Sequence, residues 1–176
     1  MNEKLFAFYA CQYEGELDRK EKLRQASSLP VGLTAVVGGL VFYAFQIEKV
    51  ALFLPIVSVI LSFLAISALV GFFILSAQFY IAVGYKWIPD ADEWNKWHTS
   101  LKDHARLFPD AEAPKKTFQT ELLQTYIRCA GFNKVENDRK SGLLHQMHQT
   151  ILAAIGISSL AAFFKLLHDH GQFLYQ

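Results

Sequence analysis

The chain alternates between long apolar stretches and charged segments, and this pattern predicts its main elements. The longest stretch without a charged residue includes Ala51 to Tyr85, and two shorter ones occupy residues 25–47 and 141–164. About 20 apolar residues suffice for a helix to span the hydrocarbon core of a bilayer. We therefore expect three transmembrane helices, with the third span at about Ile151–Leu167.

Local signals predict how the first two spans begin and end. Ser27 or Ser28 is expected to cap the first span, and Pro30 follows in its first turn, where proline is tolerated. The Ala51–Tyr85 stretch is longer than one perpendicular crossing needs, and Gly71 is the only helix breaker in its middle. We expect one long helix that either tilts or carries its last two turns into the cytoplasm.

The charged segments also have helical patterns. Apolar residues recur at three- and four-residue spacing within residues 3–24, which indicates an amphipathic helix. These residues are Phe6, Tyr9, Tyr13 and Leu17. We expect this helix to pack against other cytoplasmic helices, and a helix lying on the membrane surface is the alternative. A short helix is predicted over Asp92–Leu107, and a long proline-free helix from Thr117 to about Leu167.

Lysine and arginine are concentrated in residues 1–30 and 86–140, and such residues favour the cytoplasmic side of a membrane. The predicted fold class is an all-α membrane protein with three transmembrane helices, a cytoplasmic N-terminus, an external C-terminus and a cytoplasmic helical portion. The expected segments are a cytoplasmic amphipathic helix (1–27), a transmembrane hairpin (28–85), a cytoplasmic helical region (86–148), a third transmembrane helix (149–168) and an external tail (169–176).

Composition argues against several classes of function. The net charge of +1 gives no electrostatic reason to expect direct nucleic-acid binding. Cys11 and Cys129 lack metal-site spacing and are expected to be inert thiols. His145 and His148 share a helical face, but two histidines without a third ligand make a weak metal site. No phosphate loop, nucleophile elbow or HExxH motif occurs, so we predict no enzyme activity and no cofactor or metal.

Small and polar residues inside the spans are the first group of candidate functional residues. Ser58, Ser62 and Ser76 share a face of the second span, where they either bond to neighbouring helices or line a narrow pore. The third span carries a stripe of small residues at four-residue spacing, which favours close helix packing. This stripe consists of Ala154, Ser158 and Ala162. No ionisable residue lies in the middle of a span, which argues against a proton relay or coupled transporter.

A second group of candidates precedes the third span. Asn133 and Asn137 lie one helical turn apart, and Arg139 follows closely. In one interpretation the asparagines form hydrogen bonds with neighbouring helices or subunits. In the other, these three residues contact a ligand or a partner protein.

Three segments together resemble a family of small bacterial membrane proteins. They are QYEGELDRKEKLRQASSLPVGLTAVVGGLVFY, FYIAVGYKWIPDADEW and YIRCAGFNKVENDRKSGLLHQM. The shared elements are an acidic and aromatic N-terminal helix before a Leu-Pro-Val-Gly span entry, a Gly-Tyr-Lys-Trp-Ile-Pro exit, and an Asn-x-x-x-Asn-x-Arg-Lys-Ser-x-x-Leu stretch. The resemblance is to the transmembrane effectors of antiphage defence systems, in retron operons and in cyclic-nucleotide signalling operons of the CBASS type.

This resemblance implies a toxin-like effector of the bacterial inner membrane that a partner holds inactive until a signal arrives. The effector would then form homo-oligomers, permeabilise the membrane and cause abortive infection. A reverse transcriptase–nucleic acid complex or a cyclic-nucleotide signal from the same operon is the implied trigger. The alternative is a non-conducting membrane anchor or assembly subunit that recruits a cytoplasmic partner.

Overall fold

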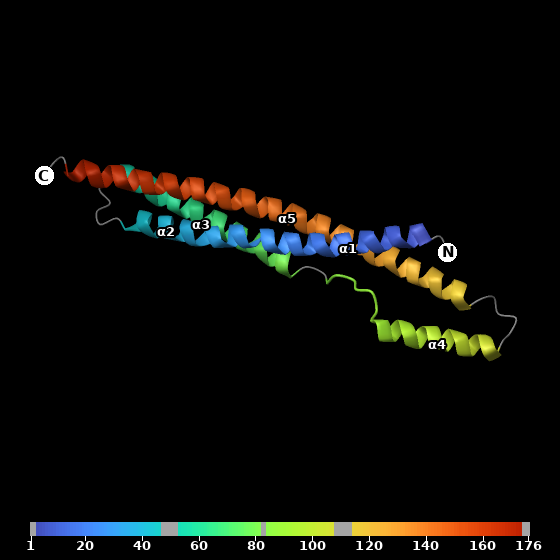
Figure 1. The fold of residues 1–176 in the computed structure, drawn as a ribbon. Helices are drawn as coiled ribbons and strands as arrows, with labels where there is room; N and C mark the ends of the chain where they lie inside the picture. The colour runs from blue at the N-terminus through green and yellow to red at the C-terminus, as the bar shows by residue number, and fades with distance from the viewer. Residues whose placement is uncertain (1–2, 47–52, 82–83, 108–113, 174–176) are drawn as a thin grey trace. The chain divides into compact units, whose positions relative to one another are not determined.

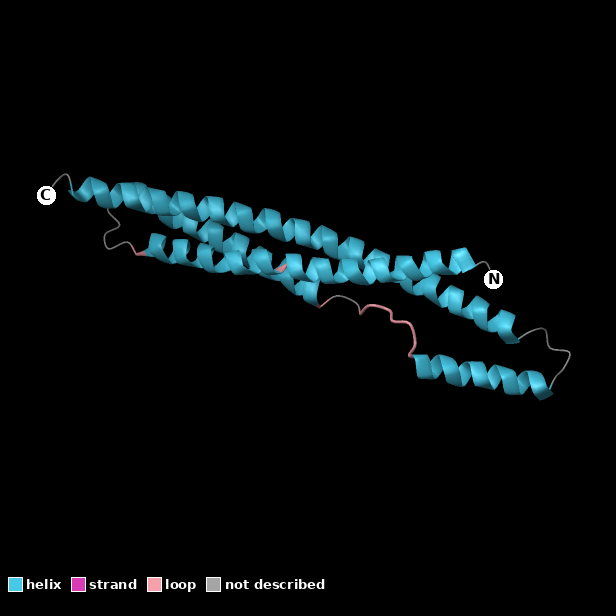
Figure 2. Ribbon diagram, viewed as in Figure 1, coloured by secondary structure: helices cyan, strands magenta, loops and turns pink. Residues whose placement is uncertain are grey.

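The structure is a computed structural model that describes residues 3–46, 53–81, 84–107 and 114–173 (Figure 1). These residues form five α-helices and no strand, which confirms the all-α prediction (Figure 2). The helices are α1 (Glu3–Ala26), α2 (Ser28–Phe45), α3 (Phe53–Tyr80), α4 (Ala91–Leu107) and α5 (Pro114–Phe173). The connection between the two helices of the predicted hairpin (28–85) and the end of the predicted tail (169–176) fall largely outside the described residues.

Three described helical segments are long and apolar enough to cross a membrane, as the charge-free stretches predicted. They are Glu3–Phe45, Ile56–Tyr80 and Phe118–His170. The predicted continuous helix before the third span is also confirmed, because α5 extends over 60 residues from Pro114 to Phe173. Which side of a membrane each terminus faces stays a prediction.

The second span is one helix, as expected, but it ends earlier than the charge-free stretch does. Helix α3 has 28 residues and ends at Tyr80, so it is about 42 Å long at 1.5 Å per residue. The helix is therefore shorter than the one expected over the whole charge-free stretch, and whether it tilts or enters the cytoplasm stays a prediction. The Lys86 amide donates instead to the Asn133 side chain, and the Ile88 amide to the Tyr13 hydroxyl. The amide hydrogens of this segment therefore bond to side chains of α1 and α5, and not to the backbone carbonyls of a continued helix.

The predicted serine cap of the first span is also wrong. Ser27 stays in the right-handed helical region, with φ −72° and ψ −16°, and its side chain makes no capping hydrogen bond. Its hydroxyl donates to the Arg24 carbonyl at 2.7 Å, and the Ser28 hydroxyl to the Gln25 carbonyl at 2.7 Å. The Ser27 amide still bonds to the Leu23 carbonyl, so few free amides remain for a cap. Pro30 has no amide hydrogen to donate to the preceding turn, which explains the interruption between α1 and α2 at Ser27.

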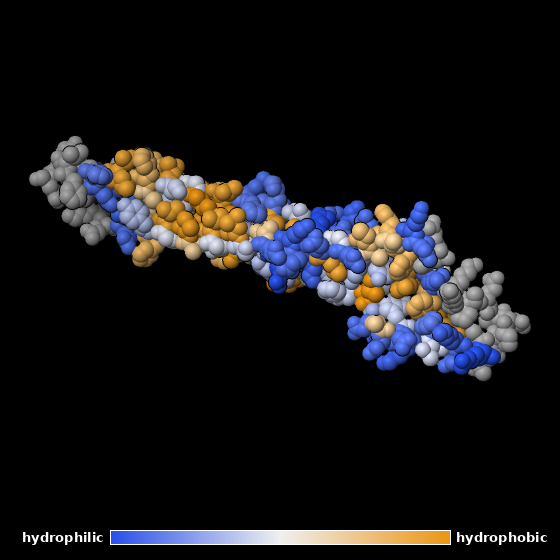
Figure 3. All heavy atoms as spheres, viewed as in Figure 1, coloured by the Kyte–Doolittle hydropathy of each residue, from blue (hydrophilic) through white to orange (hydrophobic). Residues whose placement is uncertain are grey.

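The contacts divide the chain into two compact units. We call residues 23–82 and 140–176 the apolar unit, and residues 1–22 and 83–139 the polar unit. In the apolar unit, α2, α3 and the C-terminal part of α5 lie side by side (Figure 1). Hydrophobic atoms cover most of the visible face of these helices (Figure 3). Large apolar side chains remain exposed there, including Ile60, Phe63 and Leu152.

Buried positions in the apolar unit recur with alternating steps of three and four residues. Where two buried positions are seven residues apart, the residue that would divide the interval is half-buried. The buried positions are Ser27 just before α2; Pro30, Val37, Val41 and Ala44 on α2; Ser58, Ser62, Ala65, Phe72, Ser76 and Phe79 on α3; and Leu144, Met147, Ile151, Ala154, Ser158, Ala161, Lys165 and His168 on α5. A repeat of 3.5 residues is typical of helices that pack like a coiled coil. We call this buried face the seam.

The polar unit packs around aromatic side chains. Tyr126 of α5 makes edge contacts with the rings of Phe6 and Tyr13 of α1, at centroid distances of 5.2 and 5.8 Å. This confirms that the aromatic face of α1 packs against another helix. Helix α4 contacts the α5 ring of Phe118 through Trp97 and its neighbours, at 5.3 Å for Trp97.

Candidate functional site

Two fully buried asparagines on α5 organise the polar unit. Asn133 and Asn137 each have 0% of their surface exposed. They lie one turn apart, so their side chains leave the same face of the helix. Burying an amide without hydrogen-bond partners is costly, which makes the identity of their partners informative.

Asn133 binds the backbone of Lys86 with both polar atoms of its amide. Its Oδ1 accepts the Lys86 amide hydrogen at 2.9 Å, and its Nδ2 donates to the Lys86 carbonyl at 3.0 Å. This pair has the pattern of a backbone pairing between strands. It holds the backbone of the segment after α3 against α5.

Asn137 joins three elements of the polar unit. Its Oδ1 accepts a hydrogen bond from the Tyr85 hydroxyl at 2.5 Å. Its Nδ2 donates to the carbonyl oxygen of Glu16 at 2.7 Å and to the Oε2 atom of the same residue at 2.8 Å. Burial and the negative charge of Glu136 raise the pKa of Tyr85, so its phenol stays protonated and able to donate.

The bonds of the two amides favour the structural interpretation of these residues. Both amide oxygens and both amide nitrogens are engaged by the chain itself. A ligand or partner at either asparagine would have to displace a buried hydrogen bond. Their predicted role in such a contact stays a prediction.

Arg139, the third member of the predicted group, contacts a different residue. Its Nε and Nη2 atoms donate to the two carboxylate oxygens of Glu136 at 3.1 and 2.9 Å. This bond raises the pKa of the Arg139 guanidinium. The Glu136 side chain is 7% exposed and that of Arg139 42%, so the guanidinium covers the carboxylate from the solvent side.

The residues of α1 that complete this cluster are not among those predicted from the sequence. Glu16 bonds to Asn137, and the Lys20 ammonium lies 4.5 Å from the centroid of the Trp87 ring. Their signal was the continuation of the Phe6, Tyr9 and Tyr13 spacing by further steps of three and four residues. A search restricted to apolar residues follows that pattern to Leu17 and passes over Glu16.

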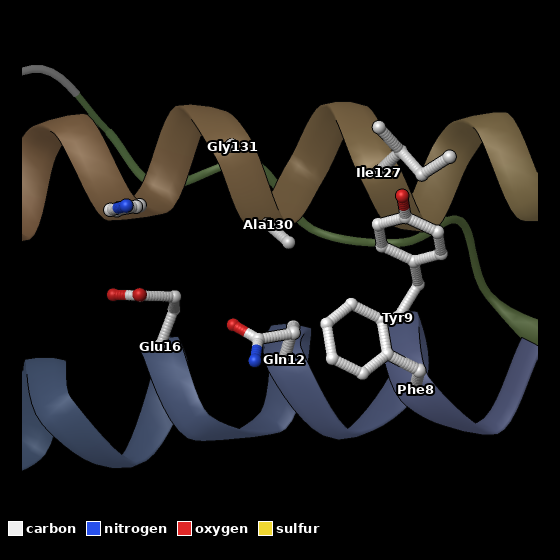
Figure 4. Close-up of a pocket in the computed structure, with 8 residues that line it drawn as sticks. Phe8, Tyr9, Gln12, Glu16, Ile127, Ala130 and Gly131 are labelled. Carbon is white, nitrogen blue, oxygen red and sulfur yellow. The ribbon is translucent and has the colours of Figure 1, made fainter. Parts of the chain in front are cut away.

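A groove of about 300 Å³ lies beside this cluster, between α1 and α5. Phe8, Tyr9, Gln12 and Glu16 of α1 face Ile127, Ala130 and Gly131 of α5 (Figure 4). Lys134 completes the lining. The wall is mostly apolar, with Phe8 55% exposed and Ile127 40% exposed.

The serines of α3 lie inside the apolar unit. Ser58 and Ser62 are both 0% exposed. The Ser58 hydroxyl donates to the Ala161 carbonyl of α5 at 2.9 Å, and the Ser62 hydroxyl to the Ser58 carbonyl at 2.9 Å. Ser76 is also buried, and its hydroxyl has no hydrogen-bond partner among the described residues. For Ser58 and Ser62 this arrangement favours helix packing over pore lining.

The small residues of the third span are displaced by one position from the predicted stripe. Ala154 and Ser158 are fully buried, whereas Ala162 is only half-buried and Ala161 is fully buried. Four-residue steps drift around a helix of 3.6 residues per turn, and alternating steps of three and four do not. Ala161 therefore occupies the next position of the seam.

A buried charged side chain closes the seam near the end of α5. Lys165 is 7% exposed, and its ammonium donates to the Asp169 Oδ2 atom at 2.7 Å. The ammonium also lies 4.9 Å from the centroid of the Tyr43 ring, which belongs to α2. His168 is 7% exposed on the same face.

The structure gives a partner for one of the two histidines considered as metal ligands. The His148 Nδ1 atom lies 2.8 Å from the Leu144 carbonyl oxygen, one turn earlier on α5. Among the residues that the structure describes, no three His, Cys, Asp or Glu side chains are grouped closely enough to hold a metal ion.

In comparisons with known proteins, no family model, no curated protein and no solved structure matches this chain.

Proposed function

We propose that this chain is a membrane effector of a bacterial antiphage defence system that oligomerises and permeabilises the inner membrane when triggered. The resemblance of its three sequence segments to such effectors motivates the proposal. In this view the apolar unit crosses the inner membrane and the polar unit is exposed to the cytoplasm, where a signal would arrive. Death of the infected cell would then stop phage production.

The observation that carries the proposal is an apolar exterior around a core that is mostly apolar but contains fully buried serines. Large side chains such as Phe63 and Leu152 are 59% and 62% exposed, which suits contact with lipid. The interior holds Ser58, Ser62 and Ser158, each 0% exposed. A membrane needs polar groups along any path that carries water and ions. The seam supplies such groups in a concealed form.

Concealment fits an effector that is dormant before it is triggered. Because the Ser58 and Ser62 hydroxyls are bonded to backbone carbonyls, this arrangement is closed. Conduction would require the helices to separate or rotate so that the seam faces water. A triggered population shift of this kind needs a signal that binds the open state more tightly than the closed one.

The same bonds also favour a second candidate, the non-conducting anchor. If the Ser58–Ala161 bond exists only to pack α3 against α5, the seam never opens. The polar unit would then recruit a cytoplasmic partner and the apolar unit would only hold it at the membrane. The two functions differ in whether the seam becomes accessible to water.

Cysteine accessibility separates them. Cys11 and Cys129 are first replaced by alanine, and cysteine is then introduced by Ser58→Cys or, as a matched control, by Ser67→Cys, since Ser67 is exposed on the same helix. Bacteria that carry each variant with its neighbouring genes are treated with a charged, membrane-impermeant thiol reagent, before and after phage challenge. We expect S58C to react only after challenge and S67C, shielded by lipid, to react at neither time.

Entry of a membrane-impermeant dye is recorded in parallel for the unmodified chain. Dye entry after challenge together with newly reactive S58C supports the effector. An unreactive S58C and excluded dye in infected cells would refute it and support the anchor.

A further inference from the structure

We propose that Lys165 determines the ion selectivity of the conducting state and that this state favours anions over cations. This inference rests on the proposed function, because it requires that the seam line a conduit. It concerns a residue that the sequence placed at the end of the third span, beyond the apolar stretch.

The Lys165 ion pair has its positive end buried and its negative end exposed. The Lys165 side chain is 8% exposed and that of its partner Asp169 is 48% exposed. The ammonium is therefore inside the apolar unit and the carboxylate outside. Burying an ammonium is expensive, and ionisable residues retained within spanning segments usually have a function.

Lys165 lies on the same buried face of α5, the seam, as Ser158. Ser158, Ala161 and Lys165 follow one another by steps of three and four residues and are all buried. The Ala161 carbonyl accepts the Ser58 hydroxyl, so this face of α5 is turned toward α3. A rearrangement that brings the seam serines to water would bring the ammonium of Lys165 with them.

The charge buried in the described part of the apolar unit is positive. The buried polar side chains that the structure describes in the apolar unit are Ser27, Ser58, Ser62, Ser76, Ser158, Lys165 and His168. Serine is neutral, histidine is neutral or positive, and lysine is positive. Within the described part of this unit no carboxylate is buried, and Asp169, which pairs with Lys165, is 48% exposed. Rings of positive side chains give anion selectivity to pores, and oligomerisation would repeat Lys165 around the conduit.

The test measures the chloride-to-potassium permeability ratio by patch clamp under a salt gradient, in giant spheroplasts of bacteria that carry the full-length chain with its neighbouring genes and have been challenged with phage to supply the trigger. For the unmodified chain we expect a ratio of about threefold or more in favour of chloride, because a nearby fixed charge biases ion occupancy. Lys165→Gln should bring the ratio close to one. Lys165→Arg, which keeps the charge, should preserve it, and Asp169→Asn, which removes only the exposed partner, should preserve or increase it.

Because Lys165→Gln removes the buried half of an ion pair, a second design starts from a single folded variant. Lys165→Cys in the cysteine-free chain is modified in the bilayer with a positively or a negatively charged thiol reagent. The positive adduct should favour chloride and the negative adduct potassium. A conductance that prefers potassium in the unmodified chain, or that is unaltered by the sign of the adduct, overturns the inference and leaves the proposed function standing. A chain that never conducts overturns both.

Discussion

Replacing Asn133 by leucine should release the backbone of Lys86 from α5. Leucine has nearly the shape of asparagine, so the substitution removes hydrogen bonds without opening a cavity. The two lost bonds are those to the amide hydrogen and to the carbonyl of Lys86, at 2.9 and 3.0 Å. Asn133 makes no other hydrogen bond that would confuse the comparison among those described.

The expected magnitude follows from these two bonds. Each net hydrogen bond contributes about 1 kcal/mol, so the local opening of this segment should become easier by about 2 kcal/mol. That value corresponds to roughly a thirtyfold increase in the open population. The figure is near the lower end for buried bonds, because the exposed position of Lys86 lets water replace part of what is lost.

Hydrogen exchange at the Lys86 amide measures this opening directly, in detergent micelles or lipid nanodiscs. We expect the amide to exchange about thirtyfold faster in N133L. The Ile88 amide, which donates to the Tyr13 hydroxyl, is the internal reference for release of the whole segment. Asn95→Leu on the exposed face of α4 is the matched control and should leave both amides unaltered. An exchange rate at Lys86 within about twofold of the unmodified chain would show that the hydrogen bonds of Asn133 do not hold the Lys86 backbone.

Two further predictions concern matched pairs. Ser58→Ala should lower the free energy of unfolding by about 0.5–1.5 kcal/mol because it removes the bond to the α5 backbone, whereas Ser76→Ala, whose hydroxyl has no described partner, should be neutral or stabilising. Thermal unfolding in one detergent compares them, and equal losses would contradict the assigned bonds. At pH 8 a maleimide should modify the exposed Cys11 and leave Cys129 intact, because burial shields that thiol and raises its pKa. The raised pKa means that the folded chain disfavours the Cys129 thiolate. The contribution of Cys129 to stability is therefore complete below its unfolded pKa and is lost as pH rises through its folded pKa. Equal labelling of both thiols, measured by mass spectrometry, would show that the polar unit is open.

The long helices could be predicted because their signals are local. Charge-free length indicates α3 wherever it packs, and the absence of proline after Pro114 lets α5 continue to Phe173. The end of α3 at Tyr80 could not be predicted in the same way. Its determinants include Asn133 and Tyr13, which are remote in sequence and bond to the chain just beyond it.

The candidate residues show the same division between local and remote information. The burial of the serines and asparagines could be anticipated from their spacing, but the partners that decide their roles could not. Ser58 bonds to Ala161, and Asn137 to Glu16, across separations of 103 and 121 residues. The drift from Ala161 to Ala162 in the predicted stripe has a simpler cause, because a four-residue period was used where the helices follow one of 3.5.

If α3 crosses a bilayer, as its length and composition allow, the surrounding lipid becomes part of the energetics of this protein. A helix of about 42 Å exceeds the hydrocarbon thickness of about 30 Å that a bilayer offers. This hydrophobic mismatch has to be absorbed by tilt or by stretching of the neighbouring acyl chains, at fractions of a kcal/mol per ångström. Thicker membranes relieve the load and thinner ones increase it. Acyl-chain length therefore enters the balance between any two arrangements of these helices that differ in tilt, even with the same residues in contact.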